Sequence, residues 1–196
     1  MGIGATYRFL TLNLAYGFPF LNPDRGQGKT EYLDLQAHLY GRSSNIDLFG
    51  QFYNGMYLEP KGLGRADGNY YLRPDIRLRE YGGSYQYIIN HKRYSFRSSY
   101  LQNEWQYRSA GTLLIGGELF IGKAKADSSV FPAIGVQSNR PSTDFLRFYE
   151  IGPNIGYAYT YIIARHFFIT GSLSFAADFS NTTFSGPDKK SNKYGL

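Results

Sequence analysis

The chain alternates hydrophobic and polar residues with a period of two over long stretches. In Leu10–Gly17, leucines and a tyrosine alternate with small or polar residues, and Leu33–Tyr40 and Tyr157–Ile163 repeat the pattern. Because the side chains of a strand point alternately to opposite faces, each segment builds one apolar and one polar wall. The pattern therefore predicts an all-β protein made of antiparallel strands.

The alternating segments predict nine strands. They are Gly2–Tyr7, Leu10–Phe18, Glu31–Gly41, Asn45–Tyr57, Tyr81–Asn90, Arg93–Asn103, Thr112–Gly122, Glu150–Ile163 and Phe167–Phe179. Most have about the 9–11 residues expected of a tilted membrane strand. Tight turns alternate with longer loops rich in glycine, proline and charge, as in outer-membrane barrels, where the long loops face the outside of the cell.

The alternation of short and long connections fails at one place. Lys123–Arg147 would fall on the side of the short turns, and Ala164–His166 on the side of the long loops. We therefore expect either a further strand near Ser128–Val136 or one false strand elsewhere. Polar residues 181–196 are predicted to form a loop or tail.

Aromatic residues make up 18% of the chain and gather near the ends of the predicted strands. Two such belts suit rings that lie at the two interfaces of a membrane. The pattern predicts an antiparallel, up-and-down transmembrane β-barrel of the outer-membrane type, with roughly 8–12 strands when complete. A soluble barrel or sandwich is the alternative. The expected lipid-facing residues are Leu10, Leu12, Leu33, Leu35, Ile46 and Leu48.

The polar wall carries more charge than a dry core tolerates, because an unpaired buried charge costs several kcal/mol. A hydrated or plugged barrel lumen accommodates such residues. We expect Arg97 to pair there with Asp47 or Glu118. The predicted lumen network consists of Asp34, Gln36, His38, Asp47, Gln51, Arg97, Glu118, Glu150 and Asp178.

Length and composition suit a single domain over residues 1–196. No apolar run approaches the ~20 residues of a membrane-spanning helix. The chain has no cysteine, which excludes disulfides and cysteine metal sites.

The net charge is +6, but the basic residues are scattered over predicted loops, which favours a solvated surface over nucleic-acid binding. The first residues contain no secretory signal, so we expect a fragment of a longer precursor.

No motif predicts a catalytic residue, a cofactor or a metal site. Asp24–Thr30 is similar to a phosphate loop, but Pro23 replaces its first glycine and a period-two segment replaces its helix. His38 and Asp34 share the polar face and could activate a serine or water, although a hydrogen-bonded lumen histidine is the simpler interpretation. The other two histidines lie in tight turns, so no metal triad is expected.

Several stretches resemble an outer-membrane family of Bacteroidota known as domain of unknown function 4421. They are Gly2–Asn22, Lys29–Tyr40, Ile46–Tyr53, Tyr71–Asp75 (YLRPD), Tyr81–Tyr87 (YGGSYQY), Tyr100–Trp105 (YLQNEW) and Tyr157–Gly171. The resemblance implies an exported barrel protein of the cell envelope, without an established activity. It also implies a signal upstream and more chain after Leu196. It transfers no catalytic residues.

We expect a structural or accessory outer-membrane barrel whose extracellular loops bind an envelope protein or a surface glycan. Exposed loops on a rigid scaffold commonly carry binding. The alternatives are a small-solute channel through the lumen and a lipid or ester hydrolase based on His38 and Asp34. The expected contact residues of the loops are Tyr70, Tyr71, Arg73, Asp75, Arg77 and Arg79.

Overall fold

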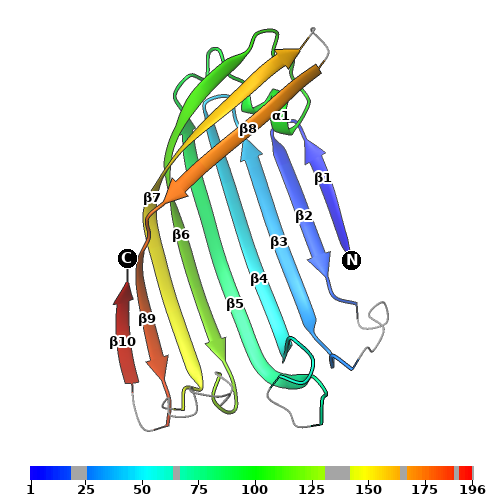
Figure 1. Cartoon of the computed structure of the whole chain (residues 1–196), viewed down its shortest axis with the longest axis vertical. Helices are drawn as coiled ribbons and strands as arrows, with labels where there is room; N and C mark the ends of the chain where they lie inside the picture. Colours follow the sequence, from blue (N-terminus) through cyan, green and yellow to red (C-terminus); the bar gives the residue numbers. More distant parts are fainter. Residues whose placement is uncertain (19–25, 64–66, 131–141, 164–166, 188–189, 196) are drawn as a thin grey trace.

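The computed structural model describes residues 1–18, 26–63, 67–130, 142–163, 167–187 and 190–195. Within them the chain forms one ten-stranded antiparallel sheet and one short helix (Figure 1). The elements are β1 (Gly2–Tyr7), β2 (Leu10–Tyr16), β3 (Glu31–Tyr40), β4 (Ser44–Leu58), β5 (Tyr71–Ile88), α1 (Phe96–Tyr100), β6 (Ala110–Lys125), β7 (Phe145–Ile163), β8 (Phe167–Ala176), β9 (Phe179–Ser185) and β10 (Lys190–Gly195). The predicted all-β, antiparallel class is confirmed.

The strands follow one another in an up-and-down order from β1 to β7. The long strand β7 then pairs with two successive strands, its residues 154–163 with β8 and its residues 145–151 with β9. β10 pairs with β9, and within the described ranges β1 makes no ladder with β8 or β10. The sheet is therefore strongly curved but open along its edges (Figure 1).

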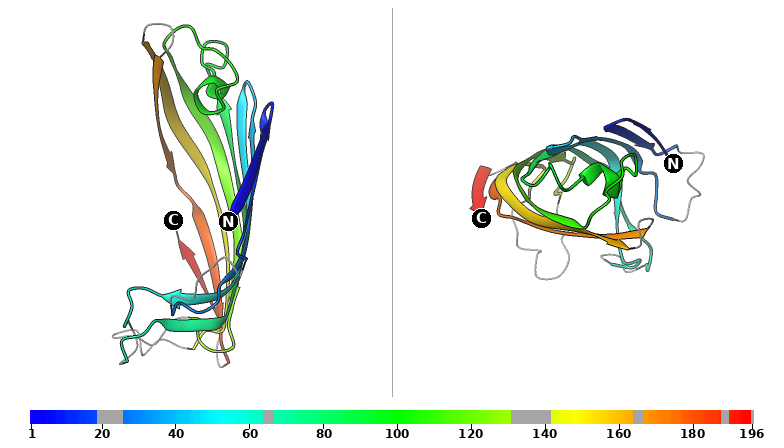
Figure 2. Two further views of the ribbon diagram at one scale, coloured as in Figure 1. Left: turned by 90° about the vertical axis from the view of Figure 1, so that its right-hand side faces the viewer. Right: turned by 90° about the horizontal axis from the view of Figure 1, so that it is seen from above.

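The two ends of the sheet differ in their connections. At one end, which we call the turn end, β1 joins β2 and β3 joins β4 through connections of two and three residues. The opposite end, the loop end, holds the connections β2–β3, β4–β5 and β6–β7, of 14, 12 and 19 residues, whereas the 21-residue connection β5–β6 also lies at the turn end. Helix α1 lies at the turn end, inside the curve of the sheet (Figure 2).

The predicted strand Arg93–Asn103 is wrong, because this segment contains α1. The Ser95 hydroxyl caps the helix by accepting a hydrogen bond from the Ser98 N–H. A serine at this position satisfies a backbone donor that a strand would pair elsewhere. Without the false strand, the connection between β6 and β7 falls at the loop end, as the alternation requires. Of the alternative strand near residues 128–136, residues 131–136 lie outside the described part, and residues 128–130 are not in a strand.

Two segments predicted as loops are strands. Tyr71–Arg79 was expected within a loop, yet β5 begins at Tyr71 and pairs with β4. A bulge at Gly55, where φ is 78°, shifts the register and allows β4 and β5 to continue beyond it. Residues 181–185 and 190–195 lie in β9 and β10 instead of a loop or tail. In both segments the strands carry polar or charged side chains, which hid them from a pattern based on hydrophobicity.

The buried core is small and lies at the turn end. It consists of Ile88, Tyr94, Phe96, Leu114 and Ala158, with Tyr40 packed against it. Three of the five come from strands β5, β6 and β7, and two from the segment that carries α1. None of the described helical residues forms a segment long and apolar enough to cross a membrane.

Candidate functional site

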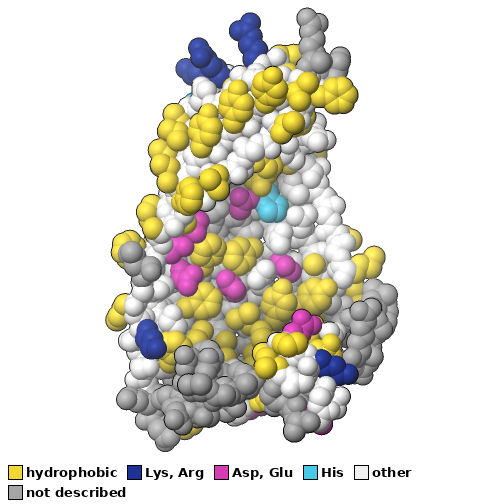
Figure 3. Space-filling view, in the orientation of Figure 1, with side chains coloured by type: hydrophobic (Ala, Val, Ile, Leu, Met, Phe, Trp, Pro, Cys, Tyr) yellow, Lys and Arg dark blue, Asp and Glu magenta, His cyan; other side chains and the backbone are white. Residues whose placement is uncertain are grey.

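The concave face of the sheet carries a row of carboxylates that we call the inner wall. Strand parity and register place these side chains on one face, because residues paired across neighbouring strands share a face. Figure 3 shows acidic side chains and a histidine gathered on the hollowed face. The inner wall comprises Asp34, Asp47, Glu80, Glu118, Glu150 and Asp178.

Strands β3 and β4 hold the first part of the predicted lumen network. The Asp34 carboxylate accepts hydrogen bonds from the side-chain amides of Gln36 and Gln51, each at 3.4 Å. His38 Nδ1 lies 2.6 Å from Asp47 Oδ1, directly across the ladder. The structure therefore pairs His38 with Asp47 and not with Asp34, its predicted partner.

A second group of polar residues spans β5, β6 and β7. The Gln86 amide donates to Asn154 Oδ1 at 3.4 Å, and the Asn154 amide donates to Glu118 at 3.2 Å. Asn154 is almost fully buried, so its amide holds Glu118 in a fixed position. Asp178 lies beside Glu118 and Gly152, and its Oδ1 is buried without a hydrogen-bond partner within the described part.

Arg97 does not join this network. It lies in α1, and its guanidinium pairs with Glu104 Oε1 at 2.9 Å, so the predicted pairing with Asp47 or Glu118 is wrong. The misassigned strand explains the error, because a strand would have pointed Arg97 at the wall. In the described residues no lysine or arginine pairs with the six carboxylates of the inner wall, and Asp47 alone has a histidine partner, His38.

Aromatic rings interrupt the acidic row. Phe49 and Phe120 face each other with ring centroids 5.8 Å apart, and Gly82 lies between them on β5. A methyl group on Gly82 would overlap with both rings. Glycine is therefore required here so that the two rings can approach the backbone of the strand between them.

The segment of residues 89–109, which we call the plug segment, crosses the hollow at the turn end. Phe96 packs edge-on against Tyr40 of β3, with ring centroids 5.3 Å apart. The hydroxyls of Ser99 and Tyr100 bond Thr160 of β7 and Ser172 of β8 at 2.9 and 2.8 Å. These contacts join strands that lie far apart in the sheet, so the plug segment closes much of this end.

At the loop end an ion pair ties the first residues of β5 to the β6–β7 connection. Arg73 is buried, and its Nε and Nη2 donate to the two carboxylate oxygens of Asp75, each at 2.9 Å. The same guanidinium bonds the Ser129 carbonyl at 2.6 Å and the Ser128 hydroxyl at 3.1 Å. The Arg73 guanidinium lowers the pKa of the Asp75 carboxyl to about 2. We call this group the loop clamp.

The other predicted contact residues lie around the loop clamp. Tyr70 packs edge-on against Tyr57, with ring centroids 5.4 Å apart, and Tyr71 begins β5. Arg77 and Arg79 are exposed on the convex face of β5. The six residues thus separate into a buried ion pair, two tyrosines and two free arginines, and do not form a single patch.

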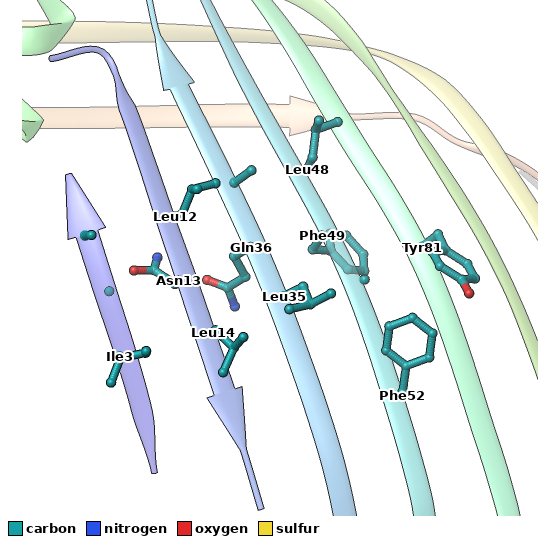
Figure 4. Close-up of a pocket in the computed structure, with 14 residues that line it drawn as sticks. Ile3, Leu12, Asn13, Leu14, Leu35, Gln36, Leu48, Phe49, Phe52 and Tyr81 are labelled. Atoms are coloured by element: carbon teal, nitrogen blue, oxygen red, sulfur yellow. The ribbon is translucent and has the colours of Figure 1, made fainter. Parts of the chain in front are cut away.

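The convex face is apolar over β2 to β5, away from the loop end. A shallow depression of about 610 Å³ lies there. Leu12, Leu35, Leu48 and Tyr81 contribute to it, as Figure 4 shows. Leu12, Leu35 and Leu48, three of the six residues predicted to face lipid, are exposed here. Asn13 and Gln36 border the depression from β2 and β3, but they share the concave face with Asp34, which Gln36 bonds.

The geometry offers little for catalysis or metal binding. His38 has a carboxylate partner, but no serine or threonine hydroxyl among the described residues makes a hydrogen bond with it. The described residues also contain no cluster of three histidine, aspartate or glutamate side chains placed to hold a metal ion.

Comparison with known protein families assigns this chain to one of them. The sequence model of a family described as a domain of unknown function (DUF4421) matches residues 1–194. The chain belongs to this family. The resemblance noted in the sequence is thereby confirmed over nearly the whole chain. No curated protein and no solved structure gives a significant match.

Proposed function

We propose that this DUF4421 protein is a β-barrel of the bacterial outer membrane, with its convex face in lipid. The observation that carries the proposal is β7, on which every outward residue from Tyr149 to Ile163 is exposed and apolar or aromatic. This run is about 48 Å long and, at the usual strand tilt, about 35–40 Å tall. That height suits the hydrocarbon core with its two interfaces.

Closure of the sheet is part of this proposal. The outer edges of β1, β8 and β10 have no ladder partner within the described residues. In hydrocarbon an unpaired backbone group costs several kcal/mol, so lipid-embedded sheets are closed. Strand pairing along these edges would satisfy the groups and complete the barrel.

The barrel's role in this proposal is that of a scaffold. The plug segment packs a buried aromatic core across the turn end, and the rings of Phe49 and Phe120 narrow the interior. A lumen obstructed in this way favours a structural or accessory function over transport. The loop clamp holds the β6–β7 connection against the start of β5, which supports a preorganised surface for an envelope protein or a surface glycan.

A channel for small cations is the second candidate. The observation in its favour is the inner wall, whose six carboxylates exceed their cationic partners among the described residues. Rings of aspartate and glutamate are typical of cation pathways. Transport would require a passage beside the plug segment.

Membrane placement and orientation can be tested by labelling in whole cells. The chain has no cysteine, so a single introduced cysteine is labelled uniquely. Lys61→Cys lies in the loop-end connection β4–β5, and its matched control Lys92→Cys lies at the turn end; both positions are exposed. A membrane-impermeant thiol reagent should label only Lys61→Cys. Equal labelling of both variants in intact cells, or a protein that stays soluble without detergent, would refute the proposal.

Planar bilayers separate the scaffold from the channel. Purified full-length protein should show no steady conductance steps. Reproducible, cation-selective steps that shrink in Glu118→Gln would replace the scaffold proposal with the channel.

A further inference from the structure

Three basic side chains lie directly opposite one another on the convex face near the loop end. Arg79 of β5 pairs in register with Lys123 of β6, and Lys123 pairs with Arg147 of β7. We call these three residues the basic row. All three are exposed. Adjacent strands are about 4.8 Å apart, so the row spans about 10 Å.

This arrangement is unfavourable for an isolated protein. Like charges directly opposite each other on antiparallel strands destabilise a sheet. Within the described residues none of the three cations makes an ion pair with a carboxylate. Two residues closer to the loop end on each strand, Arg77 of β5 pairs with Lys125 of β6 and adds two more cations on the same face. The repulsion would be relieved by an anion that lies across the row.

The position of the row identifies the kind of anion. Two residues further along each strand, on the same face, lie Tyr81, Ile121 and Tyr149, which are 49%, 37% and 42% exposed. They begin the apolar band, and Arg147 Nη1 donates a hydrogen bond to the Tyr149 hydroxyl at 3.4 Å. Tyrosines followed by arginine and lysine mark the boundary between acyl chains and headgroups. An anion at this height is therefore attached to a lipid.

We propose that the basic row binds the phosphorylated headgroup of a lipid in the leaflet at the loop end. The proposal rests on the membrane placement proposed above and adds a ligand to it. Guanidinium groups suit phosphate because they donate two parallel hydrogen bonds, and the lysine between them adds a point charge. The acyl chains of the same lipid would cover Tyr81, Ile121 and the apolar residues beyond them.

The test compares two triple variants of the full-length protein in non-ionic micelles. Arg79→Gln/Lys123→Gln/Arg147→Gln removes the row, and Lys92→Gln/Arg93→Gln/Arg108→Gln removes three exposed charges at the turn end. The probe is phosphatidic acid doped into the micelles, with diacylglycerol as the uncharged lipid and inorganic phosphate as the free anion. Binding is followed through the thermal unfolding midpoint as a function of lipid content.

Wild type and the turn-end variant should be stabilised by phosphatidic acid and unaffected by diacylglycerol. The row variant should bind phosphatidic acid about 100-fold more weakly, since each lysine or arginine near an anionic surface contributes about fivefold. In lipid-free micelles the row variant should be at least as stable as wild type, because the like-charge contacts are gone.

Equal stabilisation of both triple variants by phosphatidic acid would overturn this inference, as would equal stabilisation of wild type by inorganic phosphate. Failure of the membrane proposal gives a different result, in which wild-type protein stays soluble without detergent. Protein that requires detergent but gains nothing from phosphatidic acid refutes the lipid site alone.

Discussion

The turn end and the loop end are held together by different forces. At the turn end the plug segment buries Tyr94 and Phe96 against three strands, in the only buried hydrophobic cluster of the described residues. At the loop end Arg73 and Asp75 join the start of β5 to the β6–β7 connection through charge-assisted hydrogen bonds. One end is thus closed by apolar packing, whereas the other is fastened by a single ion pair.

The difference follows from what each end can bury. Most large hydrophobic side chains of the sheet point outward from its convex face, so the strands alone contribute only Ile88, Leu114 and Ala158 to the buried cluster. The plug segment completes that cluster from inside, which stabilises the turn end without relying on the membrane. The loop end has no such segment within the described residues, so directional polar contacts must order it.

The largest expected effect comes from Phe96→Ala. Phe96 is 9% exposed, stacks on Tyr100 and packs against Tyr40, so its removal leaves a cavity in the only core of the turn end. We expect a loss of about 3–5 kcal/mol in the free energy of unfolding. Urea unfolding in micelles, followed by fluorescence, measures it. The single tryptophan, Trp105, lies in the plug segment and reports on this end.

Tyr107→Ala is the matched control. Tyr107 lies in the same segment but is 78% exposed, so its truncation should change stability by less than about 0.5 kcal/mol. If Phe96→Ala were as mild as this control, the plug segment would not carry a core, and the contrast between the two ends would fail.

A smaller and local effect is expected from Arg73→Ala. The substitution removes four hydrogen bonds and leaves the Asp75 carboxylate without its main partner. Hydrogen bonds to charged groups contribute about 1.5–3 kcal/mol, and we expect a loss in that range. Limited proteolysis should show faster cleavage near Ser128, with the Trp105 signal unchanged. The exposed Arg77→Ala is the control and should be cut like wild type.

The same ion pair predicts a pH dependence. Its partner lowers the pKa of Asp75 from 3.8 to about 2, so the folded state favours the carboxylate. The stabilisation is therefore complete above pH 4 and is lost as the pH falls through about 2. With an acid-active protease, wild type and Asp75→Asn should differ at pH 4 and converge near pH 2. A difference that persists below pH 2 would show that the carboxylate charge is not what matters.

The order of most strands, and the face to which each side chain points, could be predicted from the sequence. The alternation of apolar and polar residues repeats along the whole length of these strands. The predicted strand β1 has the observed bounds, and β2, β3 and β4 differ by one or two residues at their ends. The prediction failed where a strand carries charge, as at Tyr71–Arg79, or where aromatic residues alternate without forming a strand. Ser95 before Phe96 was the available signal for α1, since serine is a common helix N-cap.

The polar contacts were less predictable than the strands. Parity alone assigns Asp34, His38 and Glu118 to one face of the sheet. The hydrogen-bond partner of each side chain depends on the register between neighbouring strands, which the period of two does not determine. One residue of difference in the β3–β4 turn decides whether His38 meets Asp47 or another side chain. The basic row depends on register in the same way, because Arg79 and Lys123 are adjacent only in the folded sheet.

The smallest effect tests whether hydrogen bonds also hold the turn end. The Ser99 hydroxyl lies 2.9 Å from the hydroxyl of Thr160, which is buried but keeps a second partner in Thr170 at 2.8 Å. Because Thr160 stays hydrogen-bonded, Ser99→Ala should cost about 1 kcal/mol or less, by the same urea titration read through Trp105. Thr160→Val removes the hydroxyl that Ser99 and Thr170 share, so it should lower the free energy of unfolding by more than Ser99→Ala does. If Ser99→Ala lowered the free energy of unfolding as much as Phe96→Ala, polar contacts would hold both ends of the sheet. The contrast between an apolar turn end and a loop end fastened by an ion pair would then fail.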